Sequence, residues 1–505
     1  MPSTLVHLLK DTVQNYPDSE AIVFQDRRVT YTELWRNICA TTNFLLQHDF
    51  NTNDRVGILL ENSPEYIEAY YAVLAAGGIA VGLNAANKAG ELSNCLNHCG
   101  AKWLFADSSH PELEEIAKQL GNIKIISIGK NNENISYIEN YMSVVNYPFD
   151  KELNLAALSD HNKPAAIIYT SGTTGNPKGV TLSHKNLYSN IHSILDYLHL
   201  DHTDSIVNVL PFYYSYGNSI LHTHLAVGGK LVLVNSMLYP NKVLEKIEEE
   251  TVTGFSGVPS TFALLLHRTR LSNYNLSSIR YMTQAGGPMA PASIAQLLNE
   301  LSGIKFFVMY GQTEASARLS YLPPEKLKEK MGSVGIAIPG VTLEIRQENG
   351  TMAKTGETGE IYATGDNIML GYWNSPDLTK KSITNGWLKT GDLAKYDDDG
   401  YIYIVGRSSD MIKSGANRIS PKEIEEVIHQ INGIEETVVV GVDDEILGQV
   451  IKAFIVPAKD STLNKKIILA HCKKNLPIYM IPKFVEFTNT LPKTTSGKIK
   501  RYQLQ

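Results

Sequence analysis

Residues 165–180 are AAIIYTSGTTGNPKGV, an apolar run followed by residues rich in glycine, threonine and serine. The run at 165–169 predicts a buried strand, and the residues after it predict a loop at the exposed end of that strand. Glycines let backbone N–H groups approach an anion closely, hydroxyls add donors, and Lys178 adds a positive charge. The stretch therefore predicts a phosphate-binding loop, although its composition alone would equally fit a plain flexible loop.

The spacing within this loop differs from that of the nucleoside triphosphatases. Those proteins use GxxxxGK[ST], in which a hydroxyl follows the lysine directly and binds the metal. Here Lys178 follows Pro177 and precedes Gly179, so the hydroxyl is missing from that position. The pattern therefore disfavours a kinase or a GTPase.

Short apolar runs that stop at Gly, Ser, Pro or Asn recur between residues 55 and 311. Such runs, joined by segments of helical period, are typical of buried parallel strands with crossover helices. The runs are RVGILL (55–60), GGIAVGL (77–83), AKWLFAD (101–107), AAIIYT (165–170), DSIVNVLPF (204–212), GKLVLVN (229–235) and KFFVMYG (305–311). Functional residues are expected at the ends of these strands.

After about Gly332 the pattern changes to glycine-punctuated, alternating strands, which favour an antiparallel or barrel-like sheet. Beyond about Gly406, two helical segments and two strand segments predict a small α+β unit. We therefore predict an α/β protein. Its large N-terminal domain (1–405) has βα subdomains with parallel sheets plus an antiparallel barrel-like part, and a hinge (406–410) leads to a small α+β C-terminal domain (411–505).

The composition is that of an ordinary globular protein and excludes several classes. With 505 residues, 43% apolar and 19% charged, the chain is too hydrophobic for disorder and long enough for more than one core. A net charge of −6 argues against a nucleic-acid partner. Four cysteines in a chain of this size fit a reducing compartment, so we expect the cytoplasm. Residues 70–83 are too few to span a membrane, and residues 1–14 predict an amphipathic helix and not a secretory signal.

Five segments follow one another along the whole chain: TSGTTGNPKGV (170–180), YGQTE (310–314), TGD (390–392), the stretch from Gly406-Arg407 to Glu425, and PKTTSGK (492–498). Together they resemble the motifs of the adenylate-forming superfamily, which includes acyl-CoA synthetases, aryl-acid ligases, peptide-synthetase adenylation domains and beetle luciferase. The resemblance implies an enzyme in which a carboxylate attacks the α-phosphate of ATP, releases pyrophosphate and leaves an acyl-adenylate.

The same resemblance implies where ATP and Mg²⁺ bind. Tyr310 resembles the residue that stacks on adenine, and Asp392 and Arg407 resemble the pair that contacts the ribose hydroxyls. Glu314 would hold Mg²⁺ against the phosphates, and Thr313 would offer a hydroxyl to them. The full set of expected nucleotide contacts is Thr170, Ser171, Gly172, Thr173, Thr174, Gly175, Lys178, Gly286, Gly287, Pro288, Tyr310, Gly311, Gln312, Asp392 and Arg407.

In the C-terminal domain, the resemblance implies a catalytic lysine and a second active face. Lys498 would stabilise the charge that develops as the carboxylate attacks the α-phosphate. The domain would then turn about residues 408–410, and a face with Lys413 and Gly415 would line a channel for the acceptor thiol. Ser409 departs from the Asp or Lys that is common at this pivot. The acceptor is coenzyme A or, alternatively, the phosphopantetheine of an acyl carrier protein.

The segment PFYYSYG (211–217) resembles the gate of the acyl pocket in this superfamily. Amino-acid-activating relatives carry an aspartate in this motif, because burying an ammonium group without a counter-charge is costly. No aspartate is present here, which predicts a small-molecule carboxylic acid that lacks an α-amino group. The residues expected to border it are Tyr214, Ser215, Gly217, Ser256 and Gly257.

Two groups of polar residues outside these motifs are assigned no function. Cys95, His98 and Cys99 would share one face of a helix, but a fourth zinc ligand is not evident. His222 and His224 would share one face of a strand, and we interpret them as structural histidines.

A non-catalytic nucleotide-binding relative is the alternative from another functional class, since a fold does not guarantee a reaction. Such a protein should have lost Glu314, Asp392 or Lys498. All three are present, so the sequence favours an enzyme.

Overall fold

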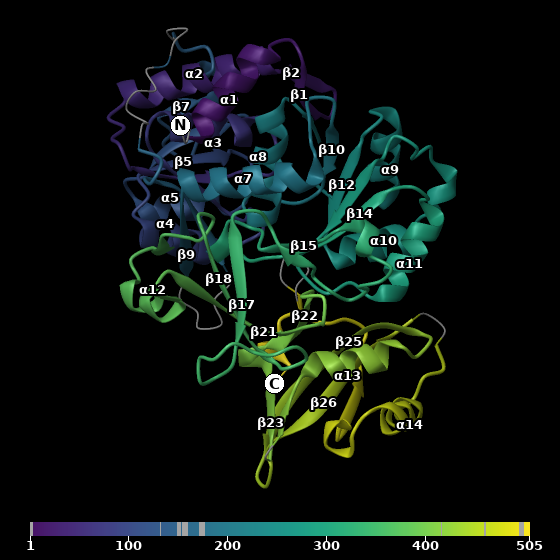
Figure 1. The fold of residues 1–505 in the computed structure, drawn as a ribbon. Helices are drawn as coiled ribbons and strands as arrows, with labels where there is room; N and C mark the ends of the chain where they lie inside the picture. The colour runs from purple at the N-terminus through teal and green to yellow at the C-terminus, as the bar shows by residue number, and fades with distance from the viewer. Residues whose placement is uncertain are drawn as a thin grey trace.

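The computed structural model describes residues 4–131, 133–148, 153, 160–170, 177–415, 417–458, 461–493 and 499–504. Among these residues the strands form four sheets, two of them large and mostly parallel and one fully antiparallel. The fourth sheet belongs to the small α+β unit toward the C-terminus (Figure 1). This arrangement confirms the predicted α/β class with its antiparallel part.

The largest sheet has nine strands. In spatial order they are β16 (Ile336–Ala337), β15 (Ser320–Leu322), β14 (Lys305–Tyr310), β13 (Tyr281–Gln284), β12 (Gly254–Gly257), β10 (Ser205–Asn208), β11 (Lys230–Leu233), β1 (Glu20–Phe24) and β2 (Arg27–Thr30). The strands from β14 to β1 run parallel to one another. Every residue of β10, β12 and β13 is buried, as expected where helices cover both faces of a parallel sheet.

The second large sheet has eight strands. Their order is β19 (Gly371–Tyr372), β9 (Lys178–Ser183), β8 (Pro164–Thr170), β4 (Ile79–Gly82), β3 (Arg55–Leu59), β5 (Trp103–Asp107), β6 (Lys124–Ile128) and β7 (Glu139–Asn140). The strands from β8 to β7 are parallel, whereas β8 and β9 form an antiparallel hairpin. The predicted strand at 165–169 is therefore confirmed as part of β8.

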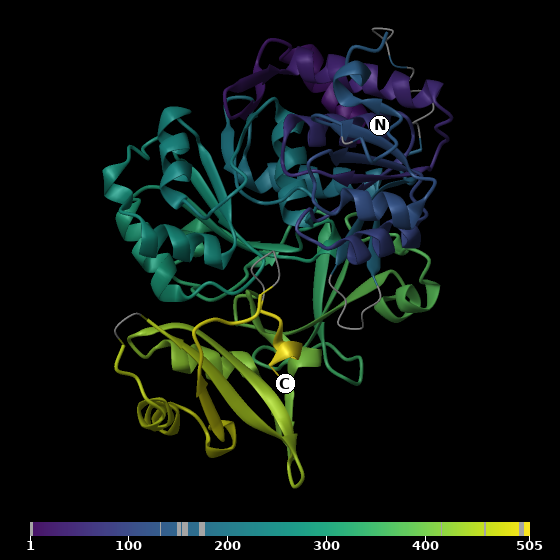
Figure 2. The same ribbon diagram turned by 180° about the vertical axis from the view of Figure 1, so that it is seen from behind.

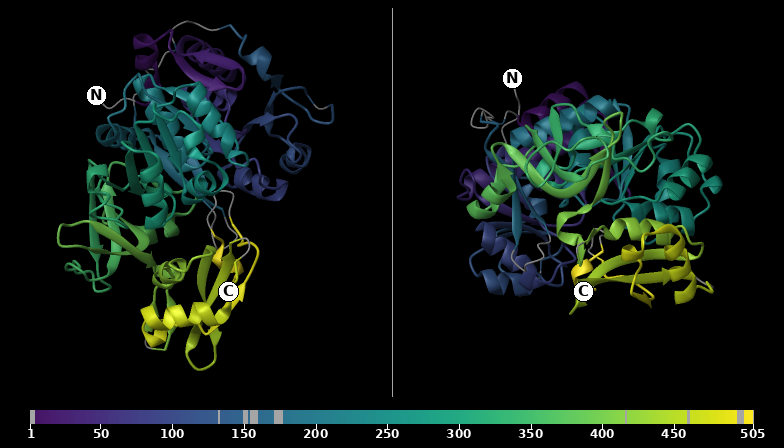
Figure 3. Two further views of the ribbon diagram at one scale, coloured as in Figure 1. Left: turned by 90° about the vertical axis from the view of Figure 1, so that its right-hand side faces the viewer. Right: turned by 60° about the horizontal axis from the view of Figure 1, so that its bottom comes forward.

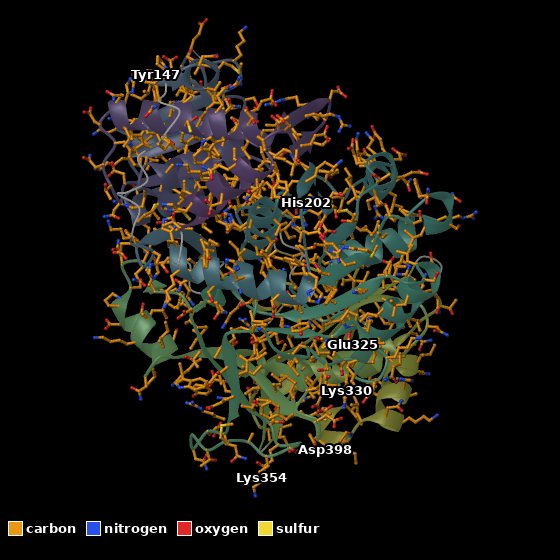
Figure 4. The ribbon with its side chains drawn as sticks, turned by 45° about the horizontal axis from the view of Figure 1, so that its top comes forward. Tyr147, His202, Glu325, Lys330, Lys354 and Asp398 are labelled. Atoms are coloured by element: carbon orange, nitrogen blue, oxygen red, sulfur yellow. The ribbon has the colours of Figure 1, made fainter. Side chains whose placement is uncertain are left out.

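The third sheet is antiparallel throughout. It contains β17 (Val341–Arg346), β18 (Gly359–Gly365), β21 (Trp387–Tyr396), β20 (Ile383–Thr384) and β22 (Ile402–Arg407). Lys330, from the segment that follows β15, donates from Nζ to the carboxylates of Asp397 and Asp399 in the turn between β21 and β22. Figure 4 labels Lys330 together with Asp398 of this turn. The ion pairs tie the antiparallel sheet to the nine-stranded sheet.

The C-terminal unit has its own sheet and its own apolar core. The strands are β24 (Asn417–Ile419), β23 (Ile412–Ser414), β26 (Gly448–Pro457), β25 (Ile434–Asp444) and β27 (Phe484–Phe487). Helices α13 (Pro421–His429) and α14 (Lys465–Asn475) bury Ile424, Ile428 and Ile468 against this sheet. Figure 1, Figure 2 and the left view of Figure 3 show this unit lying apart from the two large sheets. A short 3₁₀ turn, η5 (Ser408–Asp410), separates β22 from β23, and a hinge there stays a prediction.

Helices cover both faces of the large sheets. The helices outside the C-terminal unit are α1 (Leu5–Asn15), α2 (Tyr31–Gln47), α3 (Pro64–Ala75), α4 (Ala89–Cys99), α5 (Leu113–Leu120), α6 (Tyr141–Val144), α7 (His184–Leu198), α8 (Ser215–Val227), α9 (Pro240–Glu249), α10 (Pro259–Arg268), α11 (Pro291–Glu300) and α12 (Pro376–Ser382). Short 3₁₀ turns are η2 (Leu271–Asn273), η3 (Thr313–Ala315), η4 (Pro324–Lys326), η6 (Ile478–Met480) and η7 (Arg501–Gln503). No helix in the described part of the chain is both long enough and apolar enough to cross a bilayer.

The strand interpretation of His222 and His224 was wrong, because both lie in helix α8. This helix is buried on all sides, so its polar residues do not gather on one face and no helical period marks it. The two imidazoles have different neighbours: Nδ1 of His222 lies 2.8 Å from the hydroxyl of Tyr71, and Nε2 of His224 lies 2.9 Å from the hydroxyl of Tyr281. Burial lowers the pKa of His222 to about 3 and that of His224 to about 4, so both are neutral structural residues.

A buried carboxylate joins three helices of the N-terminal region. Glu68 on α3 is 1% exposed and accepts hydrogen bonds from Nδ2 of Asn37 on α2 (2.8 Å) and from the hydroxyl of Tyr141 on α6 (2.7 Å). Burial raises the pKa of Glu68 from 4.5 to about 7, although both hydrogen bonds act in the opposite direction. The folded protein therefore holds this proton more tightly than the unfolded chain does.

We expect this region to lose stability as the pH rises from 4.5 through about 7, because the raised pKa of Glu68 favours folding only while the carboxyl is protonated. Glu68→Gln should remove this loss, which is on the order of 1 to 3 kcal/mol. Apparent melting temperatures at about pH 5 and pH 8 measure this loss of stability. The melting temperature of the variant should rise relative to that of the wild type at the higher pH. Glu115→Gln, at an exposed position of α5, is the matched control. If the difference in melting temperature between Glu68→Gln and the wild type is the same at both pH values, the raised pKa of Glu68 is contradicted.

Candidate active site

Four parallel strands of the nine-stranded sheet end at one edge. They are β10, β12, β13 and β14, which end at Asn208, Gly257, Gln284 and Tyr310. The register pairs Gly257 with Gln284 and Gln284 with Val308, so the strand ends lie side by side. In open α/β sheets, ligands bind at the carboxyl ends of the strands. The structure therefore brings several of the predicted motifs to one edge.

The YGQTE segment forms a tight turn after β14. A Cβ on Gly311 would lie 2.0 Å from the carbonyl oxygen of Ala317, so only glycine fits there. Ser316 and Ala317 have φ values of 57° and 111°, which cost about 1 to 3 kcal/mol each in residues with side chains. The N–H of Leu319 then donates to the carbonyl of Tyr310 (2.8 Å), and the chain returns as β15. This turn carries η3 and holds it at the strand edge.

Glu314, within η3, contacts the sheet that carries the predicted phosphate loop. Its Oε1 accepts a hydrogen bond from the hydroxyl of Tyr372 on β19 (2.8 Å), and its carbonyl accepts from the N–H of Met369 (2.9 Å). Tyr372 pairs with Val180 on β9. Burial and the Glu314 carboxylate raise the pKa of Tyr372, so its hydroxyl remains a donor. No local pattern in the sequence pointed to Tyr372, because its partner Glu314 lies in a distant segment.

The predicted phosphate loop connects two antiparallel strands. Thr170 ends β8, Lys178 begins β9, and these two residues pair across the hairpin. Because β9 also pairs with β19, the base of the loop is tied to the strand that contacts Glu314. The expected ATP contacts Ser171, Gly172, Thr173, Thr174 and Gly175 lie outside the described residues and stay predictions.

Three predicted nucleotide contacts form one hydrogen-bonded cluster. Oδ2 of Asp392 on β21 accepts from the hydroxyl of Tyr310 (2.8 Å), and its Oδ1 accepts from Nε of Arg407 on β22 (2.9 Å). Burial raises the pKa of Tyr310 well above its usual value, and the Asp392 carboxylate raises it further. The charge of Asp392 also raises the pKa of Arg407. The cluster links the antiparallel sheet to the end of β14.

The predicted acyl gate touches the predicted ATP motif. Oγ of Ser215, the first residue of α8, lies 3.2 Å from Oγ1 of Thr313. A Cβ on Gly217 would lie 2.2 Å from the carbonyl oxygen of Pro211, so a side chain there would push the start of α8 away from the edge. Tyr214, the N-cap of α8, packs its ring on that of Tyr213 at 4.4 Å between centroids.

Behind this contact lies a small polar network. The hydroxyl of Tyr216 donates to the carbonyl of Thr283 (3.0 Å) and lies 2.8 Å from Oγ1 of the same residue. Oγ of Ser256 is 2.7 Å from Oγ1 of Thr283. Beside it, a Cβ on Gly257 would lie 2.9 Å from Cβ of Thr261. The network joins α8 to β12 and β13. Tyr216 lies within the predicted gate segment 211–217, whereas the sequence had not pointed to Thr283.

The loop after β13 presents its backbone at the same edge. Gly286, Gly287 and Pro288 are exposed, and Gly286 has a φ of 86°. Nε2 of Gln284 donates to the carbonyl of Gly287 (2.7 Å), whereas its buried Oε1 has no hydrogen-bond partner among the described residues. The buried Nε2 of Gln312 lacks one as well. Unpaired buried polar groups are costly and mark places where a ligand can supply the partner.

Lys413, Gly415 and Ser409 form hydrogen bonds with other residues of the C-terminal part of the chain. The backbone N–H of Lys413 donates to Oε1 of Gln449 (2.9 Å), and that of Gly415 donates to the carbonyl of Leu447 (2.8 Å). Both contacts lie where β23 meets the start of β26 in the C-terminal sheet, and Figure 1 labels both strands. Oγ of Ser409 donates to Oδ1 of Asp410 (3.0 Å). Lys498 lies outside the described residues, and its role stays a prediction.

A divalent cation fits this site only together with phosphates. In the described ranges no group of three or more His, Cys, Asp or Glu side chains could hold a metal, and this includes Cys95, His98 and Cys99. Oε2 of Glu314 accepts no hydrogen bond from any residue that the structure describes. Mg²⁺ characteristically binds one or two carboxylates plus substrate phosphates, and Glu314 provides such a carboxylate.

Known proteins share this architecture along the whole chain. The family model described as "AMP-binding enzyme" matches residues 9–373, and that of the "AMP-binding enzyme C-terminal domain" matches residues 423–498. A long-chain-fatty-acid–CoA ligase of Bacillus subtilis (strain 168) is 30% identical over 99% of this chain and 94% of its own length. A feruloyl-CoA synthase of an Amycolatopsis species is 32% identical over 97% of this chain and 96% of its own.

A solved structure gives the same match in three dimensions. The o-succinylbenzoate CoA synthetase from Bacillus subtilis, in complex with its acyl-adenylate intermediate, has a TM-score of 0.87 and 29% identity, covering 99% of this chain and 97% of that one. The same enzyme with ATP and a magnesium ion has a TM-score of 0.85 and 29% identity, with 98% of each chain covered. With one family model matching well over half of its length, the chain belongs to the AMP-binding enzymes, which are the adenylate-forming superfamily predicted from its motifs.

Proposed function

We propose that this chain is an AMP-forming acid:thiol ligase. It converts a carboxylic acid without an α-amino group and ATP into an acyl-adenylate and pyrophosphate, and then transfers the acyl group to coenzyme A. The observation that carries this proposal is the contact between Ser215 and Thr313, because it joins the acyl gate to the ATP motif at the strand edge. Both curated relatives described above are named as CoA ligases or synthases.

In the first step, a carboxylate oxygen of the acid attacks the α-phosphate, and the bond from that phosphorus to the bridging oxygen of pyrophosphate breaks. Asp392 holds the ribose hydroxyls with Arg407 beside it, and Tyr310 stacks on adenine. Negative charge that develops on the α-phosphate is stabilised by Lys498. Catalysis is therefore mostly positioning and charge stabilisation, as in other phosphoryl transfers.

Mg²⁺ would be held by Glu314, with Thr313 offering a hydroxyl to the phosphates. When bound, the ion neutralises charge on the departing pyrophosphate. Tyr372 donates to one oxygen of Glu314 and so fixes the direction of the other. Mg²⁺ and ATP are both present in the related o-succinylbenzoate CoA synthetase structure.

In the second step, the sulfur of the acceptor thiol attacks the acyl carbonyl carbon, the thiol loses its proton, and AMP departs with its phosphate oxygen. For this step we propose that the C-terminal domain turns about Ser409, so that Lys413 and Gly415 line the thiol channel. Coenzyme A is the proposed acceptor because the curated relatives are CoA ligases or synthases. Incubating the enzyme, charged with acyl-adenylate, in parallel with coenzyme A and with a carrier protein whose phosphopantetheine thiol is free distinguishes the two acceptors.

A cytoplasmic location is part of the proposal. All four cysteines are free, and three of them are buried. Burial raises the pKa of Cys39 and of Cys95 to about 12, so these thiols are poor nucleophiles at neutral pH. Free, unreactive thiols are in keeping with a reducing compartment.

The function is tested by pyrophosphate exchange and AMP release across a panel of aliphatic, branched, hydroxylated and aromatic acids, with and without coenzyme A. We expect exchange with at least one acid in the absence of thiol, and an acyl-CoA product when coenzyme A is added. ADP as the product would contradict an AMP-forming reaction. No exchange with any acid would favour the non-catalytic alternative.

Lys498→Ala should lower the rate of ATP–pyrophosphate exchange on the order of 10²-fold or more, because it removes charge stabilisation from the adenylation step. Thioester formation from supplied acyl-adenylate and coenzyme A should remain largely intact, because this step does not need the lysine. Lys500→Ala, two residues away, is the matched control and should exchange normally. Wild-type exchange in Lys498→Ala would overturn the role of this residue.

Asp392→Asn should raise the KM for ATP on the order of 10-fold or more, because it weakens charge-assisted hydrogen bonds to the ribose. The KM for the acid should change much less. Asp398→Asn makes the same chemical change at an exposed position in the turn between β21 and β22 and should leave both constants unchanged. An unaltered KM for ATP in a folded Asp392→Asn protein would remove Asp392 from the ribose site.

A further inference from the structure

Arg318 is a buried arginine without a carboxylate partner. The residue is 3% exposed, and no Asp or Glu among the described residues lies within 4.0 Å of its guanidinium. Its Nε donates to Sδ of Met309 (3.3 Å), which is a weak acceptor. An arginine side chain keeps its charge in proteins, so the charge of Arg318 is buried without a counter-charge.

Two other arginines of the chain are paired with carboxylates. Arg280 donates to both carboxylate oxygens of Asp204, and Arg407 donates to Asp392. Both of these guanidinium groups are also more exposed than that of Arg318, with side-chain exposures of 35% and 42%. Arg318 is therefore the more deeply buried charge and yet lacks the carboxylate that each of them has.

The position of Arg318 is fixed by the strained turn after η3. Its carbonyl accepts hydrogen bonds from Nδ2 of Asn367 (2.9 Å) and from Nδ2 of Asn190 (3.2 Å). The residue before it, Ala317, has a φ of 111°. Backbone strain of this kind clusters at functional sites. Here the strained residue directly precedes a buried charged side chain.

The guanidinium lies beside a residue of the predicted acyl gate, Tyr216. Its central carbon lies 4.1 Å from the centroid of the Tyr216 ring, on which it stacks. The hydroxyl of Tyr216 belongs to the network with Thr283 and Ser256. Tyr216 directly follows Ser215 on α8, and Ser215 contacts Thr313, which precedes Arg318 on the segment after β14. The same two segments therefore make two contacts, Ser215 with Thr313 and Tyr216 with Arg318.

We propose that the acid activated by this enzyme carries a second carboxylate, which pairs with the guanidinium of Arg318 while the first carboxylate is adenylated. This proposal rests on the proposed function and specifies its substrate class. A carboxylate is the group that a guanidinium fork binds through two parallel hydrogen bonds. Stacking on Tyr216 keeps the plane of the fork in one orientation, so the site is prepared for such a group before the substrate arrives.

The test compares acids of equal length with one or two carboxylates in the wild-type enzyme. The pairs are butyrate and succinate, hexanoate and adipate, octanoate and suberate, and 4-methylbenzoate and terephthalate, assayed by pyrophosphate exchange. For at least one pair, kcat/KM should favour the dicarboxylic acid on the order of 10- to 100-fold. A preference for the monocarboxylic acid in every pair would overturn the proposal and leave the AMP-forming function standing.

Variants then ask whether Arg318 causes the preference. Arg318→Met should abolish it, chiefly through a higher KM for the dicarboxylic acid, while the KM for ATP stays within a few-fold of the wild type. Arg318→Lys should retain part of the preference for the dicarboxylic acid. Arg36→Met, at an exposed position of α2, is the matched control and should retain all of this preference. A folded Arg318→Met enzyme with the full preference would overturn the proposal. If Arg318→Met does not fold, the melting-temperature shift of the wild type on adding each acid decides, and equal shifts within every pair would overturn it.

Discussion

The parallel register of β10, β12, β13 and β14 is the constraint on which the site depends. Because these strands pair in parallel, their carboxyl ends lie side by side, and every loop that leaves them emerges at one edge. The predicted acyl gate follows β10, the glycine loop follows β13, and the YGQTE turn follows β14. Segments that are far apart in sequence are therefore neighbours because of the strand pairing alone.

The other sheets act on this edge through single hydrogen bonds. Asp392 from the antiparallel sheet binds Tyr310, and Tyr372 from the eight-stranded sheet binds Glu314. Both acceptors are carboxylates, and bonds to charged groups contribute on the order of 1.5 to 3 kcal/mol each. The site thus lies where three sheets meet, and its geometry depends on their relative positions. A change in the packing between the sheets would therefore alter the geometry of the site even if each sheet stayed intact.

Much of the fold could be predicted from the sequence, because buried parallel strands are apolar runs with sharp ends, as in β3, β5 and β14. The resemblance then suggested Tyr310, Glu314 and Asp392 as site residues. Tyr372 could not be predicted, because its contact with Glu314 spans 58 residues and no local pattern records such a pairing. The helix containing His222 and His224 was missed for a related reason: a helix buried on all sides has no polar face to reveal its period.

Several departures from local rules lie at this edge, and they support a binding site there independently of the motifs. Ser316 and Ala317 have backbone angles that side chains disfavour. Gln312 retains an unpaired buried donor, and Arg318 retains a buried charge without a carboxylate. An unpaired buried polar group costs about 1 to 3 kcal/mol, a large part of a typical stability of roughly 5 to 15 kcal/mol. Losses of stability of this size persist where binding of a ligand offsets them, since a protein is selected for its bound states as well as for its fold.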